Sequence, residues 1–200
     1  ILRLTTRVAH SRSLVEIGER NDIGVKEYVK NPQKYVMMPA MARGAHVRVE
    51  ERLRAMTEFA DTEAVKAGIN SVEYNDKKIG IIAAGTSYTY AREAMGEKAS
   101  YLKLGMVNPL PVKLIKEFAA NVEKLYVIEE LDGIIETHCI RLGVKVTGKD
   151  LFSLLGEFSQ ATVQTALTEE KAYFDTFDGE IPPRPPVLCA GCPHRGLYYA

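Results

Sequence analysis

The feature that most constrains the fold is an alternation of short apolar runs with amphipathic segments between residues 79 and 146. Residues 79–84 are almost continuously apolar, as expected of a strand whose two faces are both buried. Residues 101–106 and 124–128 follow in the same way, each after a segment with helical spacing. Successive strand–helix units predict right-handed crossovers and a mainly parallel sheet between two layers of helices. The sequence therefore predicts an α/β fold, with a three-layer αβα domain at 77–167.

The helices of this domain are predicted between and after the strands. The first helix begins after Gly85 and ends near residue 99. The second begins at Pro111, since proline suits the first position of a helix. The third occupies residues 133–142, and a short last strand is predicted at 144–146. The second helix is expected to bury Leu114, Ile115, Phe118 and Ala119.

A helical linker is predicted upstream, at residues 21–76. Its first part is irregular, with a turn at Asn31-Pro32. Helical spacing over residues 45–67 indicates a helix that ends at Gly68 and whose apolar stripe forms core or an interface. The stripe consists of Val49, Leu53, Met56 and Ala60.

The two ends of the chain lie outside these elements. Residues 1–20 are predicted as a strand followed by a loop. Residues 168–186 contain four prolines in their last five positions, a composition typical of an extended connection between domains. The chain starts without Met and stops just past a cysteine motif. We therefore expect it to be a segment of a longer polypeptide.

Composition excludes several classes of function. Basic and acidic residues number 26 each, so no net charge favours nucleic acid or an anionic membrane as a partner. No apolar run approaches the roughly 20 residues of a membrane span. The three cysteines are an odd number, which argues against a disulfide framework and favours a reducing, cytoplasmic setting.

Two motifs follow predicted strands of the αβα domain. Gly85, Thr86 and Ser87 form a strand-to-helix turn, where the hydroxyls cap the helix or the backbone N–H groups contact an anion. Glu129-Glu130 and Asp132 follow the third strand. Acids at this place contact a ligand, lie at a domain interface, face solvent or cap the next helix. For His138 we expect a surface position or a hydrogen bond. Cys139 is expected to be a small buried residue.

The most specific motif is the C-x-x-C pair formed by Cys189 and Cys192, with His194 two residues further on. Pro193 follows the second cysteine, which excludes c-type haem attachment. A thioredoxin-like dithiol would lack its usual surrounding pattern. Spacing alone leaves iron–sulfur and zinc ligation equally open, because either needs further ligands. Inert thiols in this segment are a further alternative.

This tail resembles the signature that opens the thiamine-diphosphate-binding domain of indolepyruvate:ferredoxin oxidoreductase α subunits. Further resemblance covers nearly the whole chain. Residues 4–11 look like the end of that family's thiamine pyrimidine-side domain, and residues 35–40 resemble its linker. Four further stretches look like the family's transketolase C-terminal-like domain: residues 85–88, 103–105, 108–111 and 127–131.

The resemblance implies oxidative decarboxylation of indolepyruvate and other arylpyruvates, with coenzyme A and ferredoxin as acceptors and a β subunit as partner. The cofactors implied are thiamine diphosphate, Mg²⁺ and 4Fe-4S clusters, which carry the chemistry while the protein orients it. Cys189 and Cys192 become candidate cluster ligands, and His194 a candidate neighbour of thiamine diphosphate. Gly85, Thr86 and Ser87 are candidates for cofactor contact. Residues 168–200 would then contain the linker and the start of the thiamine-diphosphate-binding domain.

The family pattern is not complete in this chain. Ala190 stands where related enzymes often have proline, and the further ligands of thiamine diphosphate, magnesium and clusters are missing. We therefore expect this segment to be mainly architectural, to bind no cofactor and to be inactive alone. Two alternatives stay open. One is a scaffold or binding module with a structural metal at the tail, and the other is the equivalent domain of another thiamine-dependent 2-oxoacid oxidoreductase.

Overall fold

The computed structural model describes residues 14–168, 170, 178–180, 182, 191–192 and 194–198. The predictions for the N-terminal strand, for Cys189 and for most of the proline-rich segment lie outside the described residues. The chain divides between Arg48 and Val49 into two units.

In the first unit, the described residues 14–31 contain no helix or strand. The predicted turn at Asn31-Pro32 is instead the start of a short helix, α2 (Pro32–Tyr35). The Asn31 Oδ1 accepts a hydrogen bond from the Lys34 N–H at 3.1 Å, and Pro32 occupies the first turn, so both residues serve as start signals for a helix.

The helix predicted at 45–67 is longer and is broken. It forms α3 (Pro39–Asp61), which spans the division between the units, and α4 (Glu63–Lys66). Gly68 ends α4 with φ +70°, as predicted. Within the predicted apolar stripe, Ala60 is fully buried while Leu53 remains 36% exposed. The stripe therefore contributes to the core only at its C-terminal end.

The second unit contains a four-stranded sheet in the order β1-β3-β2-β4. Strand β2 (Ile79–Ala84) pairs in parallel with β3 (Ser100–Leu104) and with β4 (Lys124–Ile128). Strand β1 (Ser71–Glu73) pairs antiparallel with β3. The predicted α/β class with a mainly parallel sheet is confirmed. We missed β1 because three residues with polar ends produce no apolar run.

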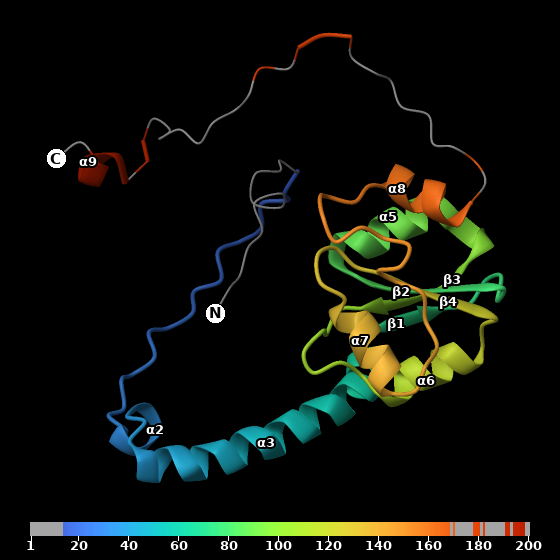
Figure 1. Ribbon diagram of the computed structural model, residues 1–200. Helices are drawn as coiled ribbons and strands as arrows, with labels where there is room; N and C mark the ends of the chain where they lie inside the picture. The colour runs from blue at the N-terminus through green and yellow to red at the C-terminus, as the bar shows by residue number, and fades with distance from the viewer. Residues whose placement is uncertain are drawn as a thin grey trace. The chain divides into compact units, whose positions relative to one another are not determined.

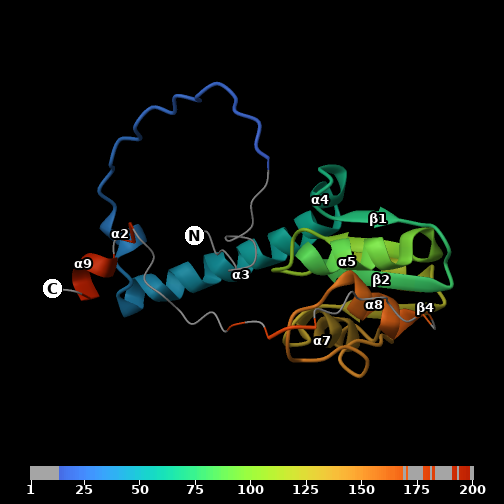
Figure 2. The same ribbon diagram turned by 90° about the horizontal axis from the view of Figure 1, so that it is seen from above.

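Helices cover both faces of this sheet (Figures 1 and 2). On one face α5 (Gly85–Met95) and α8 (Gln160–Leu167) pack against Ile81, Ala83 and Tyr101. On the other face α6 (Lys113–Ala120) and α7 (Ile134–Arg141) cover Ile82 and Leu102. Because side chains alternate along a strand, neighbouring residues supply the two cores.

The predicted last strand at 144–146 does not form. Gly143, with φ +75°, follows α7, and the side chains of Val144 and Val146 pack against the core beside α6 and α7. Only Thr147 pairs with the outer edge of β4. Its N–H donates to the Leu125 carbonyl, and its carbonyl accepts from the Val127 N–H, both at 3.0 Å.

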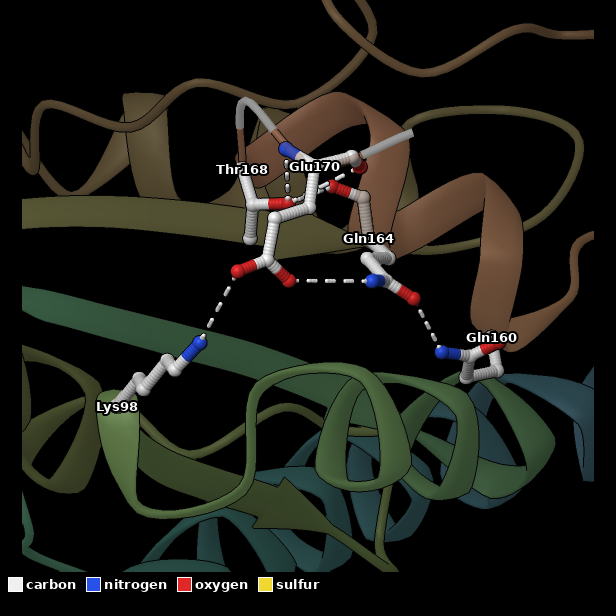
Figure 3. A network of polar contacts seen from close by, with 5 residues as sticks. All are labelled: Lys98, Gln160, Gln164, Thr168 and Glu170. Atoms are coloured by element: carbon white, nitrogen blue, oxygen red, sulfur yellow. Dashed lines mark hydrogen bonds and ion pairs between the residues drawn. The ribbon is translucent and has the colours of Figure 1, made fainter. Parts of the chain in front are cut away.

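The end of α8 is held by polar contacts to the short 3-10 helix η1 (Gly96–Lys98) (Figure 3). Gln160 Nε2 donates to Gln164 Oε1 at 2.6 Å, and Gln164 Nε2 donates to Glu170 Oε2 at 3.5 Å. Glu170 Oε1 lies 4.0 Å from Lys98 Nζ. Such an exposed ion pair contributes little stability. Among the described helices, none has the length and apolar character to cross a membrane.

Candidate functional site

The C-terminal edge of the parallel strands is the first place to look for a site. After β2 the chain turns into α5 on one face of the sheet, whereas the loops after β3 and β4 lead to α6 and α7 on the other. In open α/β sheets, ligands bind outside the carboxyl ends of strands where neighbouring connections diverge in this way. Three segments follow the strands at this edge: the first turn of α5 at residues 85–87, and the loops at 105–112 and 129–133.

The predicted turn lies at this edge. Gly85 has φ +55° and is the first residue of α5, so Thr86 and Ser87 lie inside the first helical turn. The N-cap position is occupied by Ala84, which supplies no side-chain hydrogen bond. Ser87 is buried, and the carbonyl of Thr86 accepts the Thr89 hydroxyl at 2.7 Å. The expected N-cap by Thr86 or Ser87 is therefore wrong, while an anion contact at this turn stays a prediction.

The acids after β4 serve as structural acceptors. Both carboxylate oxygens of Glu129 accept hydrogen bonds at 2.9 Å from the N–H groups of Ile135 and Glu136, in the first turn of α7. Glu130 Oε1 accepts the Phe158 N–H at 2.8 Å. Of the roles predicted for these acids, Glu129 therefore takes that of a helix cap, which also complements the positive end of the helix dipole.

Helix α6 is capped from a distant part of the chain. Its own N-cap residue, Val112, forms no side-chain hydrogen bond. Instead Asp61 Oδ1, at the end of α3, accepts the Leu114 N–H at 2.9 Å. The contact joins residues 53 positions apart and fixes the loop after β3 against the end of α3.

Asn70 joins α3 to the end of β3 by hydrogen bonds, a role that the sequence analysis did not predict. Its side chain is fully buried, and Nδ2 donates to the Ala60 carbonyl at 2.9 Å. Oδ1 accepts the N–H groups of Gly105 and Met106, each at 3.0 Å. Three backbone groups from α3 and from the end of β3 thus share one amide. No sequence pattern marked Asn70, because its partners are 10, 35 and 36 residues away.

A surface pocket of about 590 Å³ opens at the same edge, between α3, the loop after β3 and helix α7. His138, Arg141 and Asp132 contribute its charged and titratable side chains. The Nε2 atom of His138 is buried and has no hydrogen-bond partner among the described residues. His138 is half-buried at the surface pocket, and the alternative expectation of a hydrogen bond is not met at this nitrogen.

Cys139 is buried as predicted, facing the core beneath the sheet. Burial, reinforced by the nearby charge of Glu129, raises the pKa of its thiol to about 12. A thiol with such a pKa stays protonated near neutral pH and is a poor nucleophile and metal ligand.

In the tail, the structure describes Cys192 and His194 but not Cys189. The Cys192 Sγ lies 3.4 Å from the His194 Nδ1, and His194 begins the short helix α9 (His194–Tyr198). Within the described residues, no three His, Cys, Asp or Glu side chains gather in a group that could hold a metal. Ligation by this tail stays a prediction.

These observations define a three-layer α/β domain in which side-chain hydrogen bonds fix the loops after β3 and β4. Comparison of the sequence with known proteins then specifies its relatives. The whole chain is 37% identical to indolepyruvate oxidoreductase subunit IorA of Methanothermobacter marburgensis, and 32% identical to the subunits of the same name from Archaeoglobus fulgidus and Pyrococcus horikoshii. The resemblance to indolepyruvate oxidoreductases is confirmed: the chain is related to a segment of an oxidoreductase subunit.

The relatives are much longer than this chain, which spans 35% of the length of each. No protein-family model matches the sequence. Among solved structures, the chain is similar to a 2-oxoglutarate:ferredoxin oxidoreductase from Magnetococcus marinus, with a TM-score of 0.47 and 21% identity. That match covers 64% of this chain and 23% of the solved one.

Proposed function

We propose that this chain is an architectural segment of a ferredoxin-dependent oxidoreductase that oxidatively decarboxylates indolepyruvate and other arylpyruvates to acyl-coenzyme A. The observation that carries the proposal is the similarity to IorA subunits over the full length of the chain, at up to 37% identity. A β subunit and ferredoxin are the partners of the whole enzyme in this proposal. Coenzyme A and the arylpyruvate are its substrates.

The architectural role is supported by what the edge residues do. Asp61, Glu129 and Asn70 have the side chains that catalysis often uses, yet each accepts hydrogen bonds from backbone N–H groups. These bonds fix the loops after β3 and β4. We propose that residues 77–167 form the transketolase C-terminal-like domain. A helical linker at 21–76 precedes it, and residues 168–200 contain a second linker and the start of the thiamine-diphosphate-binding domain.

The cofactors of the whole enzyme would be thiamine diphosphate with Mg²⁺, which supplies the decarboxylation chemistry, and 4Fe-4S clusters, which accept electrons. In the described part of the chain, Cys192 and His194 bring together two ligating atoms, fewer than the four that a cluster or zinc needs. These residues do not complete a cofactor site, and we assign no step of the reaction to them. Gly85, Thr86 and Ser87 remain our candidates for contact with an anionic cofactor group, because Ala84 leaves their turn without a side-chain cap.

Two experiments test the proposal. Calorimetric titration of the 200-residue chain with thiamine diphosphate and Mg²⁺ should show no binding, and tight binding would contradict the architectural role. The full-length protein with its β subunit should reduce ferredoxin faster with indolepyruvate or phenylpyruvate than with pyruvate or 2-oxoglutarate. The reverse preference would instead support the equivalent domain of another 2-oxoacid oxidoreductase.

A scaffold with a structural metal is the second candidate, and the 3.4 Å contact of Cys192 with His194 favours it. Metal analysis and an absorbance spectrum of anaerobically purified chain discriminate the two. Stoichiometric zinc that is lost in Cys192→Ser supports the scaffold. Metal-free, folded protein supports a tail that needs the rest of the enzyme.

A further inference from the structure

The pocket of about 590 Å³ at the C-terminal edge of the sheet has the size and place of a ligand site. Ligand pockets in proteins measure about 300 to 1,000 Å³ and lie in open α/β sheets at the carboxyl ends of strands. This pocket is lined by the loop after β3, by the start and one side of α7, and by Thr57 of α3.

The walls combine apolar side chains with polar and charged ones. Val107, Pro109, Leu110 and Val112 come from the loop, and Ile134 comes from the first turn of α7. Leu110 is buried, whereas Val107 and Ile134 are 49% and 67% exposed. Apolar surface left in contact with water at a concave site is a driving force for binding an apolar group.

Helix α7 places charge at the two ends of the pocket. Asp132 lies just before the helix and Arg141 is its last residue, and the seven steps from Ile134 to Arg141 correspond to about 10 Å along a helix. One end of the pocket is therefore acidic and the other basic. Arg141 has no carboxylate within ion-pairing distance among the described residues, which leaves its guanidinium available to a ligand.

The basic end also contains a nitrogen that lacks a partner. His138 lies one turn before Arg141 and lines the pocket, and its buried Nε2 has no hydrogen-bond partner in the described part of the chain. Leaving a buried polar atom unpaired is costly, and such atoms in native proteins call for a partner such as a bound group. A ligand group in the pocket would be such a partner once the imidazole turns toward it.

We propose that this pocket binds a small organic acid, with its carboxylate at Arg141 and His138 and its apolar body against Val107, Leu110 and Ile134. A guanidinium binds a carboxylate in a bidentate way, and histidine adds a further hydrogen bond. The site is independent of thiamine, clusters and turnover. Its test therefore succeeds or fails separately from the proposed enzymatic function.

Phenylacetate is a suitable probe, because it joins a carboxylate to one apolar ring. Titrated into the ¹⁵N-labelled chain, it should cause saturable amide shifts at residues 107–112 and 132–141. Acetate, which lacks the ring, should bind at least tenfold more weakly, since it buries little apolar surface. Phenethylamine carries the opposite charge and should also bind at least tenfold more weakly.

Substitution locates the site. Arg141→Ala should weaken phenylacetate binding about tenfold, the loss expected for a charge-assisted hydrogen bond. Arg141→Lys keeps the charge but loses the bidentate geometry, so its effect should be intermediate. Lys116→Ala removes an exposed cation of α6 that does not line the pocket and should change nothing. Circular dichroism confirms that each variant is folded.

Three results would overturn the inference. The first is the absence of saturable shifts up to about 10 mM phenylacetate, a concentration above the millimolar affinity of even weak sites. The second is equal binding of phenethylamine. The third is an equal effect of Arg141→Ala and Lys116→Ala.

Discussion

Replacing Asn70 with alanine tests how much the stability of the domain depends on the buried amide that joins α3 to the loop after β3. The native side chain donates to the Ala60 carbonyl and accepts from Gly105 and Met106. The orientation of the amide follows from these partners, because two N–H donors require the oxygen and a carbonyl requires the nitrogen. Alanine removes all three bonds at once and leaves three backbone groups unpaired.

The expected cost is large for a single substitution. Each unpaired buried group costs about 1–3 kcal/mol, and water entering the vacated space recovers part of the sum. A loss of about 3–5 kcal/mol in the free energy of unfolding follows. Domains of this kind are stable by about 5–15 kcal/mol, so Asn70→Ala should remain folded but weakly so.

Urea unfolding followed by far-ultraviolet circular dichroism measures the loss. With a slope of about 2 kcal/mol per molar, the midpoint should fall by about 2 M urea. Asn121→Ala is the matched control. Its Nδ2 donates one exposed hydrogen bond to the Glu117 carbonyl at 2.7 Å, so its midpoint should move little. If Asn70→Ala lowers the midpoint no more than Asn121→Ala, the proposed role of the buried amide is wrong.

Three further predictions concern the same domain. Glu129→Gln should lower the free energy of unfolding by about 1–2 kcal/mol in urea, since an amide cannot accept both N–H groups of α7, whereas exposed Glu123→Gln should leave it unchanged. Gly105→Ala should cost at least about 2 kcal/mol, because a Cβ there would lie 2.2 Å from the Ile69 carbonyl oxygen; a melting temperature equal to that of the native chain would contradict this. Because the pKa of Cys139 is raised from 9.0 to about 12, the free energy of unfolding should fall by about 1 kcal/mol between pH 9 and pH 10, where only the unfolded thiol ionises. Urea unfolding across this range should show a shallower fall in Cys139→Ala, and an equal fall would refute the assignment.

The local pattern of apolar residues was sufficient to predict the three parallel strands and the fold class. The apolar runs at 79–84, 101–106 and 124–128 became β2, β3 and β4 with ends displaced by two residues or fewer. Gly68 ended a helix as predicted, because a left-handed residue after a helix favours glycine. These features depend on residues a few positions apart, which a sequence shows directly. The tail motif likewise indicated the relatives through a few consecutive residues.

The boundaries of weaker elements needed the tertiary structure. Strand β1 forms because β3 offers an open edge, and its own three residues carry no strong signal. Residues 144–146 have strand-like side chains, yet Val144 and Val146 pack into the core, so that only Thr147 reaches β4. Pairing of this kind depends on which partner lies nearby in space.

The contrast between local sequence signals and contacts made by the fold is clearest at the candidate site. From the sequence, the acids after β4 had several possible roles, and Asn70 and Arg141 had none. The fold decided between the roles by bringing Glu129 to the start of α7, Asp61 to Leu114 and Asn70 to Gly105. The pocket beside His138 arises in the same way, from segments that meet only after the sheet has formed. The sequence by itself thus determined the class of fold and the relatives, through local spacing and motifs. The tertiary structure alone decided which polar groups are engaged, because buried hydrogen bonds are satisfied by whatever partners folding brings together.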